Sequence, residues 1–345
     1  MTLDIALLLG QDGIVNGAIY ALLALALVLV FSVTRVIFIP QGEFVAYGGL
    51  TLAALEDGRT PGTLWLLWAA CAAVLAADGW SAARSRSARR LARVLAWNLA
   101  YPAALWAVLR LAPFGAWPAP AQIALALALV VPLGPALHRV VYQPLAGAST
   151  LVLLIVSVAV HFALVNVGLL FFGAEGSRTR PFSEARVGVA STVVGVQSIL
   201  VVLFSIALIA ALYLFFERTA YGKALRASAM NRAGARLVGI PIAFSGRLSF
   251  ALAALVGAFS GMLVAPITTL YYDTGFLIGL KGFVGAILGG LASYPLAALG
   301  AVLVGLVEAA ASFWASAHKE SIVFTMIVPV LLWRSLRTRH VEDDE

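Results

Sequence analysis

Long apolar blocks dominate this sequence and restrict it to one class of fold. Most blocks run for about 18 to 24 residues, the length of a helix that crosses a bilayer, and breaks rich in glycine and charge separate them. Only 11% of the residues are charged, whereas soluble domains are about a quarter charged. We therefore expect an all-α, polytopic transmembrane helical bundle that forms one domain over residues 1–345, without a separate soluble domain.

The polar breaks divide the chain into eleven candidate segments, several of which are too short to span a membrane as a full helix. They are residues 14–33, 36–55, 62–79, 94–112, 120–137, 149–172, 199–216, 247–270, 281–293, 297–316 and 322–336. We expect about 9–11 membrane segments, some of them short or broken.

Basic residues set the predicted orientation, because lysine and arginine are retained on the cytoplasmic side. The densest basic run, 84–93, joins segments 62–79 and 94–112; placing it inside gathers 16 of the 23 basic residues on that side. The N-terminus is then periplasmic, and the C-terminus, with its charged tail at 338–345, is cytoplasmic. Because the basic residues lie between apolar blocks rather than on one water-exposed face, we do not expect a nucleic-acid partner.

Polar and helix-breaking residues at membrane depth mark the first region of interest, 39–49. Pro40 interrupts a helix there, and a buried carboxylate such as Glu43 is costly unless it is paired or hydrated. A broken helix lining a water-filled pathway and a cytoplasmic turn with Glu43 at a helix N-terminus explain this pattern equally well.

The second region, 282–295, is rich in glycines three or four residues apart, a spacing that favours close helix packing. Its short apolar length also fits a half-helix beside a pathway, and Glu308 in the next segment needs a partner inside the bundle. The pathway candidates from both regions are Asn16, Tyr20, Gln41, Gly42, Glu43, Gly285, Gly289, Gly290 and Glu308.

The third region is a long cytoplasmic loop at 217–247 with a helical pattern that stops at Gly239 and Pro241. Its expected apolar stripe consists of Leu225, Ala229, Ala235 and Val238, and its cations facing water or acidic lipid are Lys223, Arg226, Arg232 and Arg236. A basic helix lying on anionic headgroups and a surface that docks a cytoplasmic protein are both compatible with these charges.

Catalytic patterns are missing from the sequence. It has no G-x-x-x-x-G-K-[ST] phosphate loop, no H-E-x-x-H spacing and a single cysteine, Cys71, so we expect neither an enzyme nor a metal site. His161 and Asn166 lie inside an apolar segment, where interhelical hydrogen bonds are the common role of such residues.

Five stretches resemble one known family in their residues and their order: 16–33, 41–49, 142–149, 219–240 and 282–309. The most specific are the T-x-Y-G-x-x-x-R-A and A-x-L-x-G-I elements of 219–240. The family comprises the permease subunits of branched-chain amino acid ABC importers of the LivH type. The resemblance implies a permease subunit of a bacterial inner membrane that has no cofactor and no ATP-binding site of its own.

The resemblance also implies that the 217–247 loop couples this chain to an ATP-hydrolysing subunit. The residues concerned are Thr219, Tyr221, Gly222, Arg226, Ala227, Asn231, Ala235, Leu237, Gly239 and Ile240. The implied partners are a homologous second permease, two cytoplasmic ATPase subunits that use ATP, a periplasmic solute-binding protein and membrane lipid.

Two departures from the family pattern bear on the solute and the architecture. The family usually has N-x-A-H-G-E-F where this chain has Phe38 and Gln41 at the Asn and His positions, so the solute is either a branched-chain amino acid or a related small polar molecule. Residues 62–112 look like an additional helical hairpin. An ion- or proton-coupled secondary transporter or channel using Glu43 and Glu308 is the alternative function.

Overall fold

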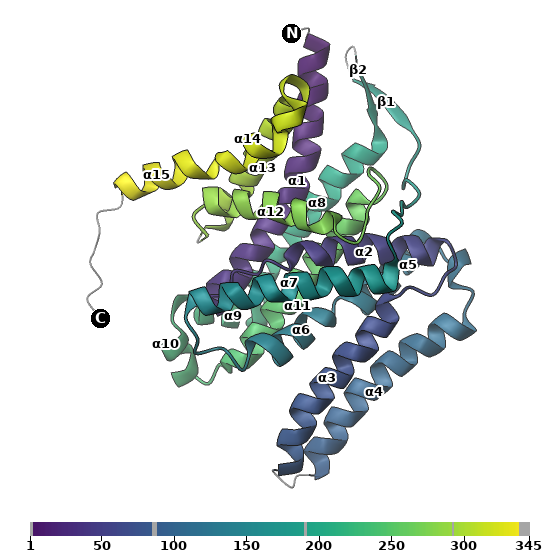
Figure 1. Ribbon diagram of the computed structural model, residues 1–345, viewed down its shortest axis with the longest axis vertical. Helices are drawn as coiled ribbons and strands as arrows, with labels where there is room; N and C mark the ends of the chain where they lie inside the picture. The colour runs from purple at the N-terminus through teal and green to yellow at the C-terminus, as the bar shows by residue number, and fades with distance from the viewer. Residues whose placement is uncertain (1–2, 85–87, 190–191, 292, 338–345) are drawn as a thin grey trace.

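The computed structural model describes residues 3–337 except 85–87, 190–191 and 292, and this part of the chain is almost entirely helical (Figure 1). Seven stretches are long and apolar enough to cross a membrane. They are α1 (Leu3–Thr34), most of α4 (Ala88–Leu111), the run from α5 (Ala119–Val130) through α6 (Leu133–Leu137) to a π-helical turn (His138–Tyr142), α7 (Thr150–Phe172), α8 (Val196–Arg218), α11 (Ile242–Val264) and α13 (Tyr294–Trp314).

Shorter elements complete the bundle. Two of them carry apolar stretches below full spanning length: α3 (Thr63–Arg84) and α12 (Thr274–Leu288). The others are α2 (Gln41–Glu56), α9 (Ala220–Met230), α10 (Arg232–Leu237), α14 (Lys319–Thr325), α15 (Ile327–Arg337), the 3-10 turns Phe114–Ala116 and Ser316–His318, and the strands β1 (Arg186–Val189) and β2 (Thr192–Gly195). The polytopic helical bundle expected from the apolar blocks is confirmed.

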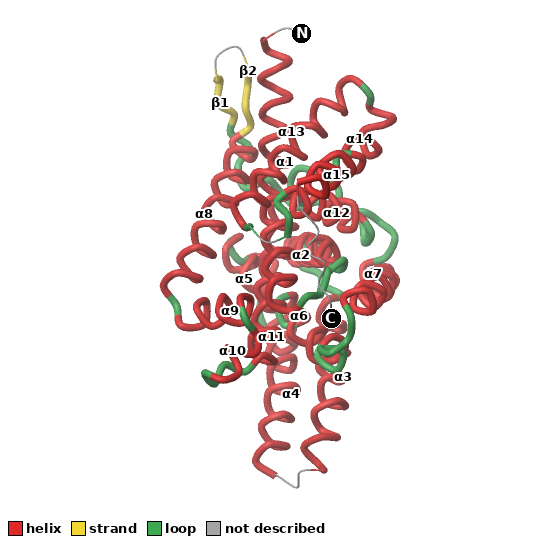
Figure 2. The backbone as a smooth tube through the Cα atoms, turned by 90° about the vertical axis from the view of Figure 1, so that its left-hand side faces the viewer, coloured by secondary structure: helices red, strands yellow, loops and turns green. Residues whose placement is uncertain are grey.

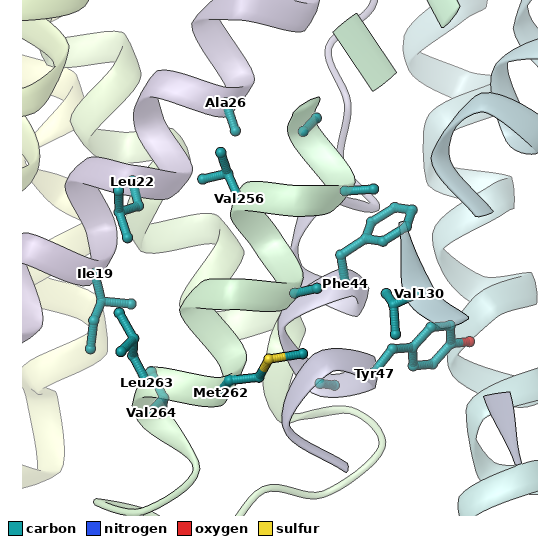
Figure 3. Close-up of a cluster of buried hydrophobic side chains, with 14 of the residues drawn as sticks. Ile19, Leu22, Ala26, Phe44, Tyr47, Val130, Val256, Met262, Leu263 and Val264 are labelled. Atoms are coloured by element: carbon teal, nitrogen blue, oxygen red, sulfur yellow. The ribbon is translucent and has the colours of Figure 1, made fainter. Parts of the chain in front are cut away.

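Helix α2 lies at the centre of the bundle, with 14 of its 16 residues buried. Small residues let other backbones approach it: a side chain at Gly42 would collide with the carbonyl of Gly275 in α12, and one at Gly48 would collide with Ala258 in α11. Figure 3 shows Phe44 and Tyr47 of α2 among buried side chains of α1, α5 and α11. Helix α13 packs along α1 on the other side of the core.

The two ends of the bundle differ in what they carry (Figures 1 and 2). The start of α1 and the antiparallel β1–β2 hairpin lie at one end. The short helices α9 and α10 lie toward the other, where the α3–α4 hairpin also projects beyond the bundle. Because α8 leads into α9 and α11 follows α10, the far ends of α8 and α11 belong to the end with the strands.

Several predicted boundaries were wrong. The segment expected at 281–293 is α12, which starts seven residues earlier, at Thr274, and ends at Leu288. The residues of the segment expected at 322–336 are divided between α14 and α15. The β1–β2 hairpin lies within the 173–198 loop, where no strand was predicted, and a helix start expected at residue 36 falls at Gln41 behind Pro40.

Candidate functional site

The first buried polar pair joins the start of α2 to the middle of α7. Oε1 of Glu43 lies 2.6 Å from Nδ1 of His161, and these side chains are only 1% and 7% exposed. The imidazole also stacks on Phe276 of α12, with ring centroids 4.2 Å apart. Glu43 sits in the first turn of α2, so the imidazole and the helix N-terminus both stabilise its position.

The surroundings of this pair are closely packed. Nε2 of Gln41 donates to the carbonyl of Ala253 in α11 at 2.9 Å, and Gly42 rests on α12. A cavity of about 40 Å³ borders Glu43, whose Oε2 has no hydrogen-bond partner among the described residues. The start of α2 is therefore an interior helix end. Glu43 lies at a helix N-terminus, as one interpretation of 39–49 expected, but it is buried within the bundle.

A second buried cluster joins α1, α12, α13 and α14. Nζ of Lys281 lies 2.5 Å from Oε1 of Glu308 and 3.1 Å from Oε1 of Glu320, and the hydroxyl of Tyr20 donates to Oε2 of Glu308 at 2.5 Å. Lys281 and Glu308 are each 7% exposed. The partner that Glu308 required inside the bundle is thus a lysine 27 residues away in the sequence.

The structure divides the nine pathway candidates into three groups. Gln41, Gly42 and Glu43 form the first, and Tyr20 and Glu308 form the second; α12 contacts both, because it begins against Gly42 and carries Lys281. The remaining candidates are partly buried or serve packing: Asn16 lies half-buried on α1, Gly285 and Gly289 allow α13 to approach, and Gly290 forms a turn with φ of 79°.

Three members of these clusters were not selected as candidates from the sequence: Lys281, His161 and Glu320. Lys281 is the first residue of the predicted segment 281–293 and was given no role, although a lysine within an apolar helix is itself a signal that a buried carboxylate is near. His161 was expected to form an interhelical hydrogen bond, which is confirmed. The same expectation for Asn166 was wrong, because its Nδ2 donates to the carbonyl of Phe162 in its own helix at 2.7 Å.

The 217–247 loop folds into α9 and α10, and capping residues in its sequence determine where these helices begin and end. The hydroxyl of Thr219 accepts from the backbone of Gly222 at 3.0 Å, and Oδ1 of Asn231 accepts from Gly234 at 2.9 Å, so each residue caps the helix that follows it. Gly239 ends α10 with φ of 83°, a left-handed conformation that suits glycine.

Side chains on the inner face tie these two helices to the bundle. Leu225 packs with Leu29 and Val33 of α1. Arg226 pairs with Glu217 at 2.5 Å, and Arg232 donates to the carbonyl of Val33 at 2.7 Å. Burial, together with the guanidinium groups of Arg35 and Arg236, lowers the pKa of Arg232.

The charges and the apolar stripe of the loop differ in part from expectation. Arg226 and Arg232 are half-buried and bound to protein groups, whereas Lys223 and Arg236 are exposed. Leu225 and Ala235 are buried as expected, but Val238 is 75% exposed.

Four apolar side chains of α9, of α10 and of the residue after α10 are exposed. They are Tyr221, Met230, Leu237 and Val238, and Met230 and Leu237 are 88% and 89% exposed. These residues lie outside the candidate spans. An apolar surface of this kind on a rigidly attached loop is typical of a protein contact. We call these four side chains the loop surface.

Of the other residues selected in this loop, Ala227 is half-buried and the backbone of Ile240 donates to the carbonyl of Ala235 at 2.9 Å.

Comparisons with known proteins agree on one family. The family described as "Branched-chain amino acid transport system / permease component" matches residues 11–332. The chain is 30% identical over 229 residues, 62% of its own length and 72% of the relative, to the high-affinity branched-chain amino acid transport system permease protein BraD of Pseudomonas aeruginosa. It is 28% identical over 218 residues, 60% of its length and 70% of the relative, to the corresponding permease protein LivH of Escherichia coli K12.

Proposed function

Because the chain belongs to the family of branched-chain amino acid transport system permease components, we propose that it transports a branched-chain amino acid or a related small polar solute as the membrane subunit of an ABC importer. It is a multi-pass inner-membrane protein, and its relatives are subunits of transporters rather than enzymes. Glu43 pairs with His161, and Glu308 pairs with Lys281. The uptake test below distinguishes this proposal from a gradient-driven transporter that uses these carboxylates.

The loop surface is the observation that carries the proposal of energy coupling. Four exposed apolar side chains lie at one end of the bundle. Their helices are fixed to α1 by the buried Leu225, to α8 by a half-exposed arginine ion pair and to α11 by a buried serine hydrogen bond. A force applied to this surface would move the attached helices as a body rather than bend a flexible loop. We therefore assign it the contact with a cytoplasmic ATPase.

The remaining parts of the importer follow from this assignment. Two ATPase subunits would bind and hydrolyse ATP, so this chain would need no nucleotide site or cofactor. A homologous second permease would complete the membrane pathway, and a periplasmic binding protein would deliver the solute to the end that carries β1 and β2. In this arrangement the N-terminus is periplasmic and the C-terminus cytoplasmic.

Co-purification with the ATPase tests the coupling surface. The double variant Leu237→Asn/Val238→Asn should lose at least about tenfold in ATPase retained on the tagged permease, because it replaces two of the four exposed apolar side chains with polar amides and removes their apolar contact area. Val187→Asn is the matched control, since Val187 is also exposed but lies on β1 at the opposite end. Equal retention by the double variant and the control would contradict the assignment.

Uptake of radiolabelled leucine tests the transport function. Proteoliposomes that contain the complete complex and ATP should accumulate leucine, and collapsing the membrane gradient with an ionophore should leave that uptake intact. Uptake that continues without ATP but stops with the ionophore would instead support a gradient-driven transporter.

A further inference from the structure

A pocket of about 480 Å³ lies at the end of the bundle opposite the loop surface. Its walls come from the C-terminal ends of α2 and α11, the N-terminal ends of α5 and α8, and the chain before β1. The volume is within the range of small-molecule sites. The pocket is separate from both buried clusters, since it contains neither Glu43 nor Glu308.

Two side chains of opposite charge line this pocket. Oε2 of Glu56 accepts a hydrogen bond from the backbone N–H of Arg180 at 2.9 Å. Among the described residues, no ion pair joins the Glu56 carboxylate to the Arg180 guanidinium, and the Arg180 side chain is exposed. The second carboxylate oxygen and the guanidinium fork therefore both have hydrogen-bonding capacity left for a ligand.

A third polar residue fixes the shape of the wall. Nε2 of Gln122 donates to the carbonyls of Phe114 and Gly115, at 3.1 and 3.3 Å. These bonds hold the turn that carries Trp117 against the start of α5, so the Trp117 side of the pocket is formed without a ligand.

The rest of the lining is mainly apolar and partly aromatic. It includes Trp117, Ile123, Phe182, Leu200, Phe204 and Phe259. A ligand that fits must therefore carry a positive group, a negative group and an apolar portion. An anionic phospholipid satisfies the apolar requirement, but its phosphate would meet Glu56 as well as Arg180, and like charges repel. A zwitterionic phospholipid carries both charges, and the dependence of labelling on lipid composition, tested below, distinguishes it from an amino acid.

We infer that this pocket binds a zwitterionic α-amino acid with an apolar side chain, its ammonium group on Glu56, its carboxylate on Arg180 and its side chain against the aromatic wall. The inference rests on the proposed transport function and gives the place where solute first binds this subunit. A bidentate guanidinium contact with the carboxylate and an ammonium contact with Glu56 would select the α-amino acid head. The apolar wall would select the side chain.

Protection of an introduced cysteine tests the site. The variant Leu200→Cys, made in a Cys71→Ala background, places a thiol on the pocket wall of the full chain in phosphatidylcholine nanodiscs. L-Leucine should slow its reaction with a methanethiosulfonate reagent. Isopentylamine lacks the carboxylate and 4-methylpentanoate lacks the ammonium group, so each should protect at least about tenfold less well.

Charge-removing variants locate the two contacts. Glu56→Gln keeps an acceptor for the Arg180 amide and removes only the charge, and Arg180→Gln removes the guanidinium. Each should raise the leucine concentration for half-protection at least about tenfold. Glu184→Gln and Arg186→Gln, exposed charges of the same segment outside the pocket, should leave it unchanged.

Three results would overturn the inference. The first is that leucine does not protect the cysteine, and the second is that both analogues protect it as well as leucine does. The third is that labelling is slow without leucine and depends on the lipid composition, which would identify a lipid site. Leucine uptake by the complete transporter separates this inference from the proposed function. If the transporter takes up leucine but leucine does not protect the cysteine, only the pocket assignment is rejected. If the transporter takes up no leucine, the proposed function on which the inference rests is contradicted.

Discussion

Replacing Lys281 by methionine should destabilise the protein far more than an ordinary charge removal. Its Nζ lies 2.5 Å from Glu308, and both side chains are 7% exposed. At an effective dielectric constant of about 20, two unit charges at that distance attract by about 7 kcal/mol, most of which offsets the cost of burying them. Removing the cation leaves the Glu308 carboxylate buried without this attraction, so we expect the free energy of unfolding to fall by about 3–5 kcal/mol.

The structure also predicts an asymmetry between the two partners. Glu308→Gln should cost less, about 1–3 kcal/mol, because Lys281 keeps Glu320 at 3.1 Å and a glutamine can still accept from Tyr20. The double variant Lys281→Met/Glu308→Gln should be more stable than Lys281→Met alone, since no unpaired carboxylate then remains at position 308.

Equilibrium unfolding in mixed micelles, with rising mole fraction of SDS, measures these differences. Lys319→Met is the matched control: its ammonium lies 3.9 Å from Glu320 but is 41% exposed, so its removal should cost about 1 kcal/mol or less. A loss for Lys281→Met no larger than for Lys319→Met, or strictly additive losses in the double variant, would refute the reasoning.

Three further outcomes follow from close packing and capping. Gly42→Ala should cost about 1–3 kcal/mol in the same unfolding assay, because its methyl group would collide with an α12 carbonyl, whereas Gly147→Ala, with no atom within 4 Å, should not. Gly222→Ala should lower leucine uptake several-fold while ATP hydrolysis continues, since the methyl group would displace α9 from the end of α8; Gly147→Ala, whose methyl group meets no atom within 4 Å, should transport normally. His161→Leu should cost about 3 kcal/mol in mixed-micelle unfolding by leaving a buried carboxylate unpaired, and restored stability on adding Glu43→Gln would verify that cause.

Sequence reasoning succeeded where the determinant is local. Apolar length alone locates most of the spans, because every backbone group in a lipid-facing segment must be satisfied within its own helix. The end of the helical pattern at Gly239 was predicted from a glycine and a proline close to that boundary, and Gly239 does end α10. These features need no knowledge of the rest of the chain.

Sequence reasoning failed where the determinant is a distant partner. Tyr20 and Glu308 are 288 residues apart, and Glu43 and His161 are 118 apart, so no spacing rule connects them. Lys281 was given no role because its buried carboxylate partner lies 27 residues away in another helix. The expected start of α12 was also seven residues too late. The β1–β2 hairpin was missed because its valines stand among glycine, serine and charged residues.

The arrangement of contacts singles out α1 as the element that would carry a displacement of the loop surface through the bundle. Its 32 residues span about 48 Å as a helix. Near its end it holds α9 through Leu29 and Val33, and closer to its start Tyr20 binds the cluster that joins α12 to α13. Since α12 also rests on Gly42, a rigid shift of α1 would act on the start of α2 through a packed contact. Coupling by this route requires the Lys281–Glu308–Tyr20 cluster to stay intact. A variant that removes the Lys281 ammonium group should therefore weaken transport more than it weakens ATPase binding.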